Sequence, residues 1–438
     1  MFKTLTSALL SVAAIAQPAL AQPVTTIVNG GPSINRIDLV VIGDGYTTAD
    51  LPKYAADVQE FVIGMFQQPP FSEYQAYFNV HRLDVISAES GADHPETGTY
   101  KNTALDATYN CAEIQRLICA DHYKVLDVVA AAMLPSERDA IVVLVNDDEY
   151  GGSGGAFAVS STHPDGVEIV LHELGHSFGL LADEYAGGGG LCDTSVEPAE
   201  PNVTASTTRT TIKWNAWIDA STDIPTESFA ADVPGLYVGA KYCDRGIYRP
   251  TYDSKMRTLG VPFERINTEQ LIKRYYNWTA PIESFSPTPG VVTVTQGHTE
   301  HFSITTLVPA SHTLERTWHV DGQSAGVEGS LVLDSSLLSI GDHSIVATAY
   351  DSTPDVRSDP DRILSQSVSW VLRVGPSVTS SRCDVNRDGA TNVIDIQVVI
   401  NEVLGLVAPT SDINNDGLVN IVDLMLYVNA ALGRGCPG

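Results

Sequence analysis

The first part of the chain alternates between apolar segments of strand-like and helix-like spacing. A β-branched run from Arg36 to Ile42 ends at Gly43-Asp44-Gly45, which is typical of a buried strand that enters a turn. From Thr48 to Met65 the apolar residues recur at helical spacing. The same patterns predict strands at Phe78–Val85 and Ala140–Val145 and a helix over Ile114–Met133. Because strands and helices alternate, we expect an α/β sheet unit.

The pattern changes after residue 280. Pro281 to Pro289 is rich in proline and is predicted to be a linker. Short alternating segments separated by turn residues follow from Val291 to Val374, which predicts a small β-sandwich. The predicted organisation is therefore a first domain over 22–280, with an α/β part at 22–160 and a second part at 161–280, a sandwich at 287–375 and a repeat-containing domain at 382–436.

The N-terminal segment indicates an exported protein. Lys3, the apolar stretch from Leu9 to Leu20 and the small residues around Ala21 form the pattern of a signal peptide over residues 1–21. No later segment is predicted to span a membrane. The chain has 25 basic and 53 acidic residues and a net charge of −28, which disfavours binding to nucleic acid or to anionic membranes. We expect a secreted protein.

The six cysteines fit an oxidising compartment. Six cysteines allow 15 pairings, and the sequence does not choose among them. Local spacing favours Cys111 with Cys119, Cys192 with Cys243, and Cys383 with Cys436. The spacing of the cysteines is unlike that of a zinc finger, so we do not expect a structural zinc site.

The segment His172-Glu173-Leu174-Gly175-His176 carries the candidate chemistry. It lies in a predicted buried helix from Val167 to Phe178. Residues four apart share one helical face, so His172 and His176 can bind a single ion. Glu173 can then act as the general base for a water molecule that attacks a carbonyl. The pattern predicts a catalytic zinc site.

The alternative is that the two histidines are hydrogen-bonded core residues. The context of the motif favours the metal. Gly179 follows where the chain must turn away, and Asp183-Glu184 comes next. A catalytic site with one open position needs a third ligand of this kind.

The sequence resembles the immunoglobulin-A-cleaving metallopeptidase family over most of residues 24–280. The resemblance lies in His172 to Phe178 and Leu181-Ala182-Asp183-Glu184-Tyr185. It extends to segments at Asn35–Val40, Gly43–Tyr46, Phe78–Val80, Ser87–Gly91, Asn110-Cys111, Val143–Asn146 and Tyr150–Gly152. It implies an α/β zincin-like, metzincin-related catalytic unit.

The resemblance also implies a ligand set of the two histidines and one acidic residue of the Asp-Glu-Tyr triplet. We prefer Asp183, with Glu184 as the alternative; this chain has Gly179-Leu180 where relatives more often carry Ala-Gly. Met256 is similar to the methionine beneath the metal of metzincin-like enzymes, although an ordinary core methionine would fit equally well. Tyr185 and Tyr252 are candidates for polarising the scissile carbonyl.

The C-terminal domain contains two repeats at an offset of 28 residues, and each matches a calcium loop. Oxygen ligands at positions 1, 3, 5, 9 and 12, with a backbone carbonyl at position 7, are typical of Ca²⁺ sites. The predicted ligands are Asp384, Asn386, Asp388, Ala390, Asn392 and Asp395 in the first loop and Asp412, Asn414, Asp416, Leu418, Asn420 and Asp423 in the second.

The calcium domain resembles a type I dockerin, because position 12 is Asp and helices follow the loops rather than precede them. The resemblance implies a cohesin-type docking partner. Positions 10 and 11 are Val393-Ile394 and Ile421-Val422, where many dockerins carry a polar pair. The predicted function is a secreted zinc endopeptidase that acts on a protein or peptide substrate. The alternative is a non-catalytic or glycan-targeted extracellular protein docked through this domain.

Overall fold

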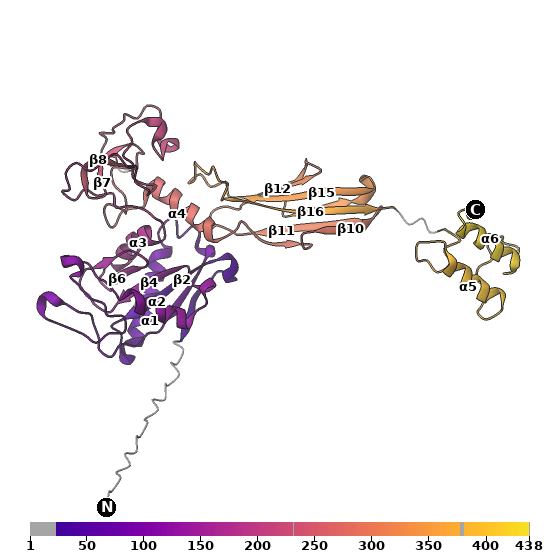
Figure 1. Cartoon of the computed structure of the whole chain (residues 1–438), viewed down its shortest axis with the longest axis horizontal. Coiled ribbons are helices and arrows are strands. Elements are labelled where there is room, and N and C mark those ends of the chain that lie inside the picture. Colours follow the sequence, from indigo (N-terminus) through magenta and orange to yellow (C-terminus); the bar gives the residue numbers. More distant parts are fainter. Residues whose placement is uncertain (1–22, 231, 377–380, 438) are drawn as a thin grey trace, which may run out of the picture. The chain divides into compact units, whose positions relative to one another are not determined.

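The computed structural model describes residues 23–230, 232–376 and 381–437 (Figure 1). The predicted signal peptide, residues 1–21, lies outside these ranges. Contacts divide the chain into two units. The first takes in residues up to 283 together with 306–315 and 349–366, and the second holds 284–305, 316–348 and 367 onward. The domain boundaries predicted above stay a prediction. Within the described ranges, every helix is too short or too polar to cross a membrane.

A six-stranded mixed sheet forms the centre of the first unit. Its strand order is β1-β3-β2-β4-β6-β5. The central pairs β2–β3, β2–β4 and β4–β6 are parallel, whereas β1 and β5 pair antiparallel at the two edges. The strands are β1 Val24–Asn29, β2 Ile37–Asp44, β3 Phe78–Leu83, β4 Ala140–Val145, β5 Gly152–Ser153 and β6 Ala158–Ser161.

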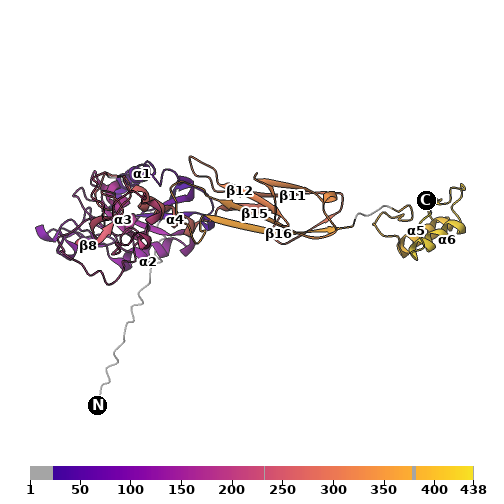
Figure 2. The ribbon, with the colours of Figure 1, turned by 90° about the horizontal axis from the view of Figure 1, so that it is seen from above.

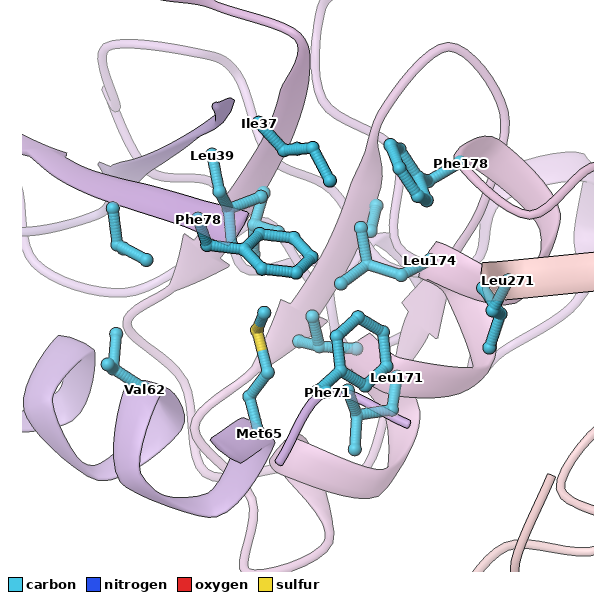
Figure 3. Packing of buried hydrophobic residues seen from close by; sticks show 14 of the residues in the cluster. Ile37, Leu39, Val62, Met65, Phe71, Phe78, Leu171, Leu174, Phe178 and Leu271 are labelled. Carbon is cyan, nitrogen blue, oxygen red and sulfur yellow. The ribbon is translucent and has the colours of Figure 1, made fainter. Parts of the chain in front are cut away.

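The apolar run of β2 is buried on both faces of the sheet, as expected for a central parallel strand. Leu39 and Val41 enter one core cluster, and Val40 and Ile42 enter the other. Figure 3 shows the first cluster, in which Leu39 lies with Leu174 of helix α3. The alternation of side chains along β2 therefore holds a helix layer on each face.

The described residues of this unit also contain four α-helices: α1 Leu51–Phe66, α2 His122–Ala132, α3 Gly166–Ser177 and α4 Glu264–Trp278. The predicted strands and the helices at α1 and α3 are confirmed. The helix predicted over Ile114–Met133 is wrong in its first part, since α2 begins only at His122. The side chain of Asp121 caps this helix by accepting hydrogen bonds from the backbone N–H groups of Tyr123 and Lys124. Before the helix, Cys119 forms an isolated β-bridge with Thr108 and a disulfide with Cys111. The backbone at Cys119 is therefore paired with another segment and is not helical.

The three predicted disulfides are confirmed: Cys111–Cys119, Cys192–Cys243 and Cys383–Cys436. The second disulfide belongs to an irregular region between α3 and α4. This region contains a two-stranded hairpin of β7 Tyr237–Ala240 and β8 Cys243–Arg249. The disulfide joins the start of β8 to the loop that follows the metal motif.

Short 3-10 helices occupy many of the connections. They lie at Ser33–Asn35, Thr48–Asp50, Gln75–Tyr77, Pro95–Thr97, Cys111–Glu113, Pro135–Glu137, Arg209–Thr211, Asn215–Trp217 and Ser335–Leu337.

The later strands form two sheets, ordered β10-β16-β15-β12-β13 and β14-β11-β9. Phe302 of the smaller sheet contacts Trp370 of the larger at a ring distance of 5.3 Å, and Trp370 stacks on Trp318. The predicted linker is wrong over Ile282–Ser286, because this segment is β9 and extends the smaller sheet. The remaining strands are β10 Val291–Thr295, β11 Thr299–Thr306, β12 Glu315–Val320, β13 Gln323–Gly326, β14 Ser330–Asp334, β15 Gly341–Tyr350 and β16 Ser365–Gly375.

Two helices, α5 Val393–Val403 and α6 Ile421–Ala431, follow the two acidic loops and pack against each other (Figure 2). Their small core contains Val399, Ile413 and Tyr427 together with Cys383. Asn392 and Asn420 cap the two helices in the same way. The internal repeat of the sequence is therefore a repeat of structure.

A buried aspartate ties residues 349–366 into the first unit. Asp351 is fully buried, and its carboxylate accepts hydrogen bonds from the hydroxyls of Tyr74 at 2.8 Å and Tyr276 at 2.7 Å. His312 Nε2 lies 2.7 Å from the other carboxylate oxygen. Tyr276 belongs to α4, so this network links the segment to a helix of the catalytic region.

We expect Asp351→Ala to lower the free energy of unfolding by about 3 kcal/mol, because two buried hydroxyls and a histidine lose their acceptor. Urea denaturation monitored by tryptophan fluorescence measures the change. The control is Asp361→Ala, an exposed aspartate of the same segment, for which we expect a change within about 0.5 kcal/mol. Equal losses of stability in the two variants would contradict the conclusion that Asp351 ties residues 349–366 into the first unit.

Candidate metal centre

Helix α3 brings the two histidines of the motif together. Ile169, Val170 and Leu174 are buried and hold the helix against the core. His172 and His176 lie one turn apart, and their Nε2 atoms are 3.1 Å from each other. The predicted convergence of the imidazoles is therefore present in the fold.

Backbone carbonyls orient both imidazole rings. His172 Nδ1 lies 2.9 Å from the carbonyl oxygen of Lys255, and His176 Nδ1 lies 2.8 Å from that of Leu181. A carbonyl only accepts hydrogen bonds, so each Nδ1 must donate. In the neutral rings, both Nε2 lone pairs then point into the shared space. This is the arrangement that a metal-binding histidine requires.

Asp183 supplies a third donor atom to the same space. Its Oδ1 lies 3.2 Å from the Nε2 atoms of both His172 and His176. This oxygen is buried and has no hydrogen-bond partner among the described residues. Three acceptor atoms that face one another without donors repel, and a cation between them relieves the repulsion. The residues present therefore fit a metal ion such as zinc.

The pKa values of His176 and Asp183 also reflect how close these two side chains are. Burial alone would lower the pKa of His176, but the nearby carboxylate of Asp183 raises it to about 9. Burial would raise the pKa of Asp183, but the two histidines hold it well below its usual range. Without a metal, a proton takes the place of the cation between these groups, so metal binding releases a proton.

Glu173 lies beside the two imidazoles. Its carboxylate and the two histidines offer donor atoms that all lie within 4.8 Å of one another. Burial raises the pKa of Glu173 above its ordinary value. Gly154, just after edge strand β5, passes close to this carboxylate, and a Cβ there would lie 2.5 Å from Glu173 Oε2. The absence of a side chain at Gly154 therefore allows the backbone after β5 and the Glu173 carboxylate to approach each other closely.

Glu184, the alternative third ligand, faces away from the histidines. It is fully buried, and its Oε1 accepts hydrogen bonds from Asn202 at 2.9 Å and Asn267 at 2.8 Å. Ser254 donates to Oε2 at 2.7 Å. With its acceptors taken by three neutral donors, Glu184 is an anchor of the loop, which favours Asp183 as the ligand.

Met256 is a buried residue packed against the metal helix. A Cβ at Gly175, which lies between the two histidines in the helix, would be 2.4 Å from Met256 Sδ. The neighbouring Lys255 provides the carbonyl that orients His172. The structure thus places this segment against the part of α3 that carries the ligand candidates.

The tyrosine beside Asp183 is one that the sequence did not indicate. Tyr242 donates its hydroxyl hydrogen bond to Asp183 Oδ2 at 2.6 Å, and Tyr185 contacts the Tyr242 hydroxyl at 3.2 Å. Tyr252, the other candidate, packs instead against Phe229. Tyr242 stands in no motif; its only signal in the sequence was its position next to Cys243.

The two C-terminal loops have closely similar geometry. Carboxylate oxygens of Asp384, Asp388 and Asp395 lie within 4.8 Å of one another. Gly389 donates its N–H to Asp384 at 2.9 Å, and Gly417 does the same to Asp412 at 2.7 Å. The remaining predicted ligands follow this symmetry. In the second loop, the backbone N–H of Asp416 donates to the Asn414 side chain, and that of Asn420 donates to the Asp423 carboxylate. In both loops an asparagine side chain donates to the backbone carbonyl of position 7: Asn392 to Ala390 and Asn420 to Leu418.

Comparisons with known proteins give one family match and several matches to solved structures. Residues 25–232 match the family described as IgA Peptidase M64. No curated protein gives a match. Fibronectin(III)-like modules of Clostridium thermocellum CbhA are 16% identical at a TM-score of 0.17, with 22% of this chain and 97% of that chain covered. A quinonprotein alcohol dehydrogenase-like protein from Bacteroides thetaiotaomicron is 10% identical at a TM-score of 0.16, with 22% and 19% covered.

Leu180, in the turn between α3 and Asp183, has a left-handed backbone with φ of 58°. This conformation is unfavourable for a residue with a Cβ. We expect Leu180→Gly to raise the free energy of unfolding by about 1 kcal/mol. Thermal and urea unfolding measure the change. The exposed Leu191 is not in this conformation, so Leu191→Gly should lower stability by about 0.5 kcal/mol. A loss of stability in both variants would show that the turn is unstrained.

Proposed function

We propose, from the membership of residues 25–232 in the IgA peptidase M64 family of metallopeptidases, that this protein is a secreted zinc-dependent endopeptidase with Glu173 as its general base. One observation carries the proposal. The Nε2 atoms of His172 and His176 and the unpartnered oxygen of Asp183 converge within 3.2 Å of one another. We assign these three residues as the zinc ligands.

Each residue of the site has a role in peptide hydrolysis. When bound, zinc supplies Lewis-acid chemistry at the scissile carbonyl. Glu173 accepts a proton from the attacking water and passes it to the leaving amine. Its raised pKa suits the first step, because a more basic carboxylate accepts a proton more readily. The carbonyls of Lys255 and Leu181 keep the imidazoles aimed at the metal.

The sheet edge beside Glu173 favours an extended peptide as the substrate. β5 is the last strand of the sheet, and Gly154 follows it with no side chain between the backbone and Glu173. A peptide that lies along this edge brings a backbone carbonyl towards Glu173 without needing a free chain end. The combination of a mixed sheet, this edge and α3 supports a zincin-like class for the catalytic region.

The cysteine pairs and the N-terminal segment support secretion. All six cysteines are in disulfides, which persist in oxidising compartments. The signal peptide predicted for residues 1–21 would direct the protein to the secretory pathway.

The C-terminal repeats support a calcium-dependent docking module. The first loop brings carboxylate oxygens of three aspartates within 4.8 Å of one another, and the second loop repeats its hydrogen bonds. Hard oxygen ligands of this kind suit Ca²⁺. Val393, Ile394, Ile421 and Val422 are exposed at the starts of α5 and α6. Because the exposed apolar residues occupy equivalent positions in the two repeats, a partner could contact either repeat through a similar apolar surface. We therefore assign two calcium sites and a cohesin-type docking partner to this module.

We expect Glu173→Gln to lower kcat/KM for casein about 100-fold or more while zinc content stays at the wild-type value, because the substitution removes the base but no ligand. Hydrolysis of labelled casein and metal analysis by mass spectrometry measure the two effects.

The control for this variant is Glu60→Gln, which removes an exposed carboxylate from α1 and should leave both values unchanged. Wild-type protein treated with a zinc chelator should lose activity and regain it when zinc is added back. Unchanged hydrolysis in Glu173→Gln and after chelation would exclude the proposed mechanism.

For the calcium module, we expect the full chain to bind two Ca²⁺ ions in isothermal titration and Asp384→Ala to bind one fewer, because the first loop loses its position-1 ligand. Asp361→Ala, an exposed aspartate outside the loops, is the control and should keep both sites. The same binding isotherm in Asp384→Ala and wild type would refute the assignment of the first loop.

A further inference from the structure

We infer that Tyr242 is a positioning residue that orients the carboxylate of Asp183 towards the metal. This inference rests on the proposed function, in which Asp183 is the third zinc ligand. It assigns a role to a residue that lies outside the stretch matched by the family, which ends at residue 232.

The two oxygens of Asp183 have different surroundings. Oδ2 accepts the hydroxyl hydrogen of Tyr242 at 2.6 Å. Oδ1 is buried, has no hydrogen-bond partner in the described part of the chain, and lies 3.2 Å from the Nε2 atoms of His172 and His176. A carboxylate can rotate about its last bond, which would exchange or displace these oxygens. The hydrogen bond from Tyr242 holds one oxygen and thereby directs the other at the ion.

Tyr185 fixes the direction of this hydrogen bond. An ionised carboxylate only accepts, so the Tyr242 hydroxyl must give its single proton to Asp183. Its remaining acceptor site faces the Tyr185 hydroxyl, which donates at 3.2 Å. The two rings also contact edge to face, with centroids 5.2 Å apart. The chain of donors therefore runs from Tyr185 through Tyr242 to Asp183.

The backbone holds Tyr242 in place at a conformational cost. Lys241 and Tyr242 form the turn of the β7–β8 hairpin with φ of 50° and 64°. Such turns favour Asn-Gly, because two consecutive positive φ values strain residues with larger side chains. A tyrosine at this position indicates that its side chain has a role which glycine could not fill.

The same turn is fastened to the segment that carries Asp183. Lys241 N donates to the carbonyl of Asp183 at 3.0 Å, and Tyr242 N donates to that of Tyr185 at 3.1 Å. The next residue, Cys243, is bonded to Cys192. Turn and ligand segment thus move together, and the hydroxyl stays at a set distance from the carboxylate.

The test compares zinc affinity in Tyr242→Phe and wild type. The variant keeps the ring and removes only the hydroxyl. Loss of a partner that orients a metal ligand typically weakens binding 10–100-fold, so we expect the zinc dissociation constant to rise by that factor. Competition with a chromogenic chelator measures it. Because the ligands remain, saturating zinc should restore most of kcat/KM, whereas Glu173→Gln should not be rescued.

Three further variants complete the design. Tyr185→Phe should weaken zinc binding less than Tyr242→Phe, since it acts only through Tyr242. Tyr237→Phe, from the same hairpin, removes a hydroxyl that donates to Val233 and should bind zinc as the wild type does. Asp183→Ala should bind zinc most weakly. Unchanged circular dichroism spectra check that each variant is folded.

The outcomes separate this inference from the proposed function. Wild-type zinc affinity in Tyr242→Phe, together with loss of zinc in Asp183→Ala, would overturn the role of Tyr242 and leave the proposed ligand set intact. Wild-type affinity in Asp183→Ala would overturn the ligand assignment itself. Equal weakening in Tyr242→Phe and Tyr237→Phe would show a general effect of the hairpin rather than orientation of Asp183. If Tyr242→Phe does not fold, the affinity of Tyr185→Phe relative to Tyr237→Phe decides.

Discussion

The site depends on one electrostatic constraint. Two imidazole nitrogens share a small space with a carboxylate oxygen that has no hydrogen-bond partner among the described residues. His172, His176 and Asp183 come within 3.2 Å of one another there. Acceptor atoms at such distances repel unless a proton or a cation lies between them. Much of the surrounding structure serves to hold these atoms together against that repulsion.

Neutral backbone groups provide most of that support. Carbonyls orient the two rings, and the hairpin turn around Tyr242 is joined to the Asp183 segment by backbone hydrogen bonds. Glu184, next to Asp183, is buried among amide and hydroxyl donors, so it fixes the chain without adding an acceptor to the metal site. Adjacent acidic residues thus have opposite environments: one faces the histidines, and the other anchors the loop.

The remaining parts of the chain use their polar groups differently. In the first unit, Asp351 binds two tyrosines of the catalytic region in a buried network, so residues far along the chain contribute to the packing of α4. In the C-terminal module, Asp384, Asp388 and Asp395 bring carboxylate oxygens within 4.8 Å of one another, with Asp388 exposed and the other two buried. The carboxylate of Asp351 is satisfied by hydrogen bonds and acts as a structural clamp, whereas like-charged carboxylates this close together favour a cation between them.

Sequence alone determined the features that depend on local spacing. The existence of strand β2, of the helix with His172 and His176 and of the duplicated acidic loops follows from periodicity or repeated motifs. Local spacing also favoured the three disulfides, although the sequence alone allows other pairings. These signals are contained within short stretches, so no knowledge of the fold is needed to read them.

Tertiary structure decided what depends on distant residues. Whether Asp183 or Glu184 faces the histidines depends on Asn202, Ser254 and Asn267, which lie 18, 70 and 83 residues away from Glu184. The start of α2 depends on a disulfide and a strand bridge that compete for the backbone before it. The position of a tyrosine hydroxyl beside a carboxylate 59 residues earlier has no local signature. Such contacts arise only when the chain folds back on itself.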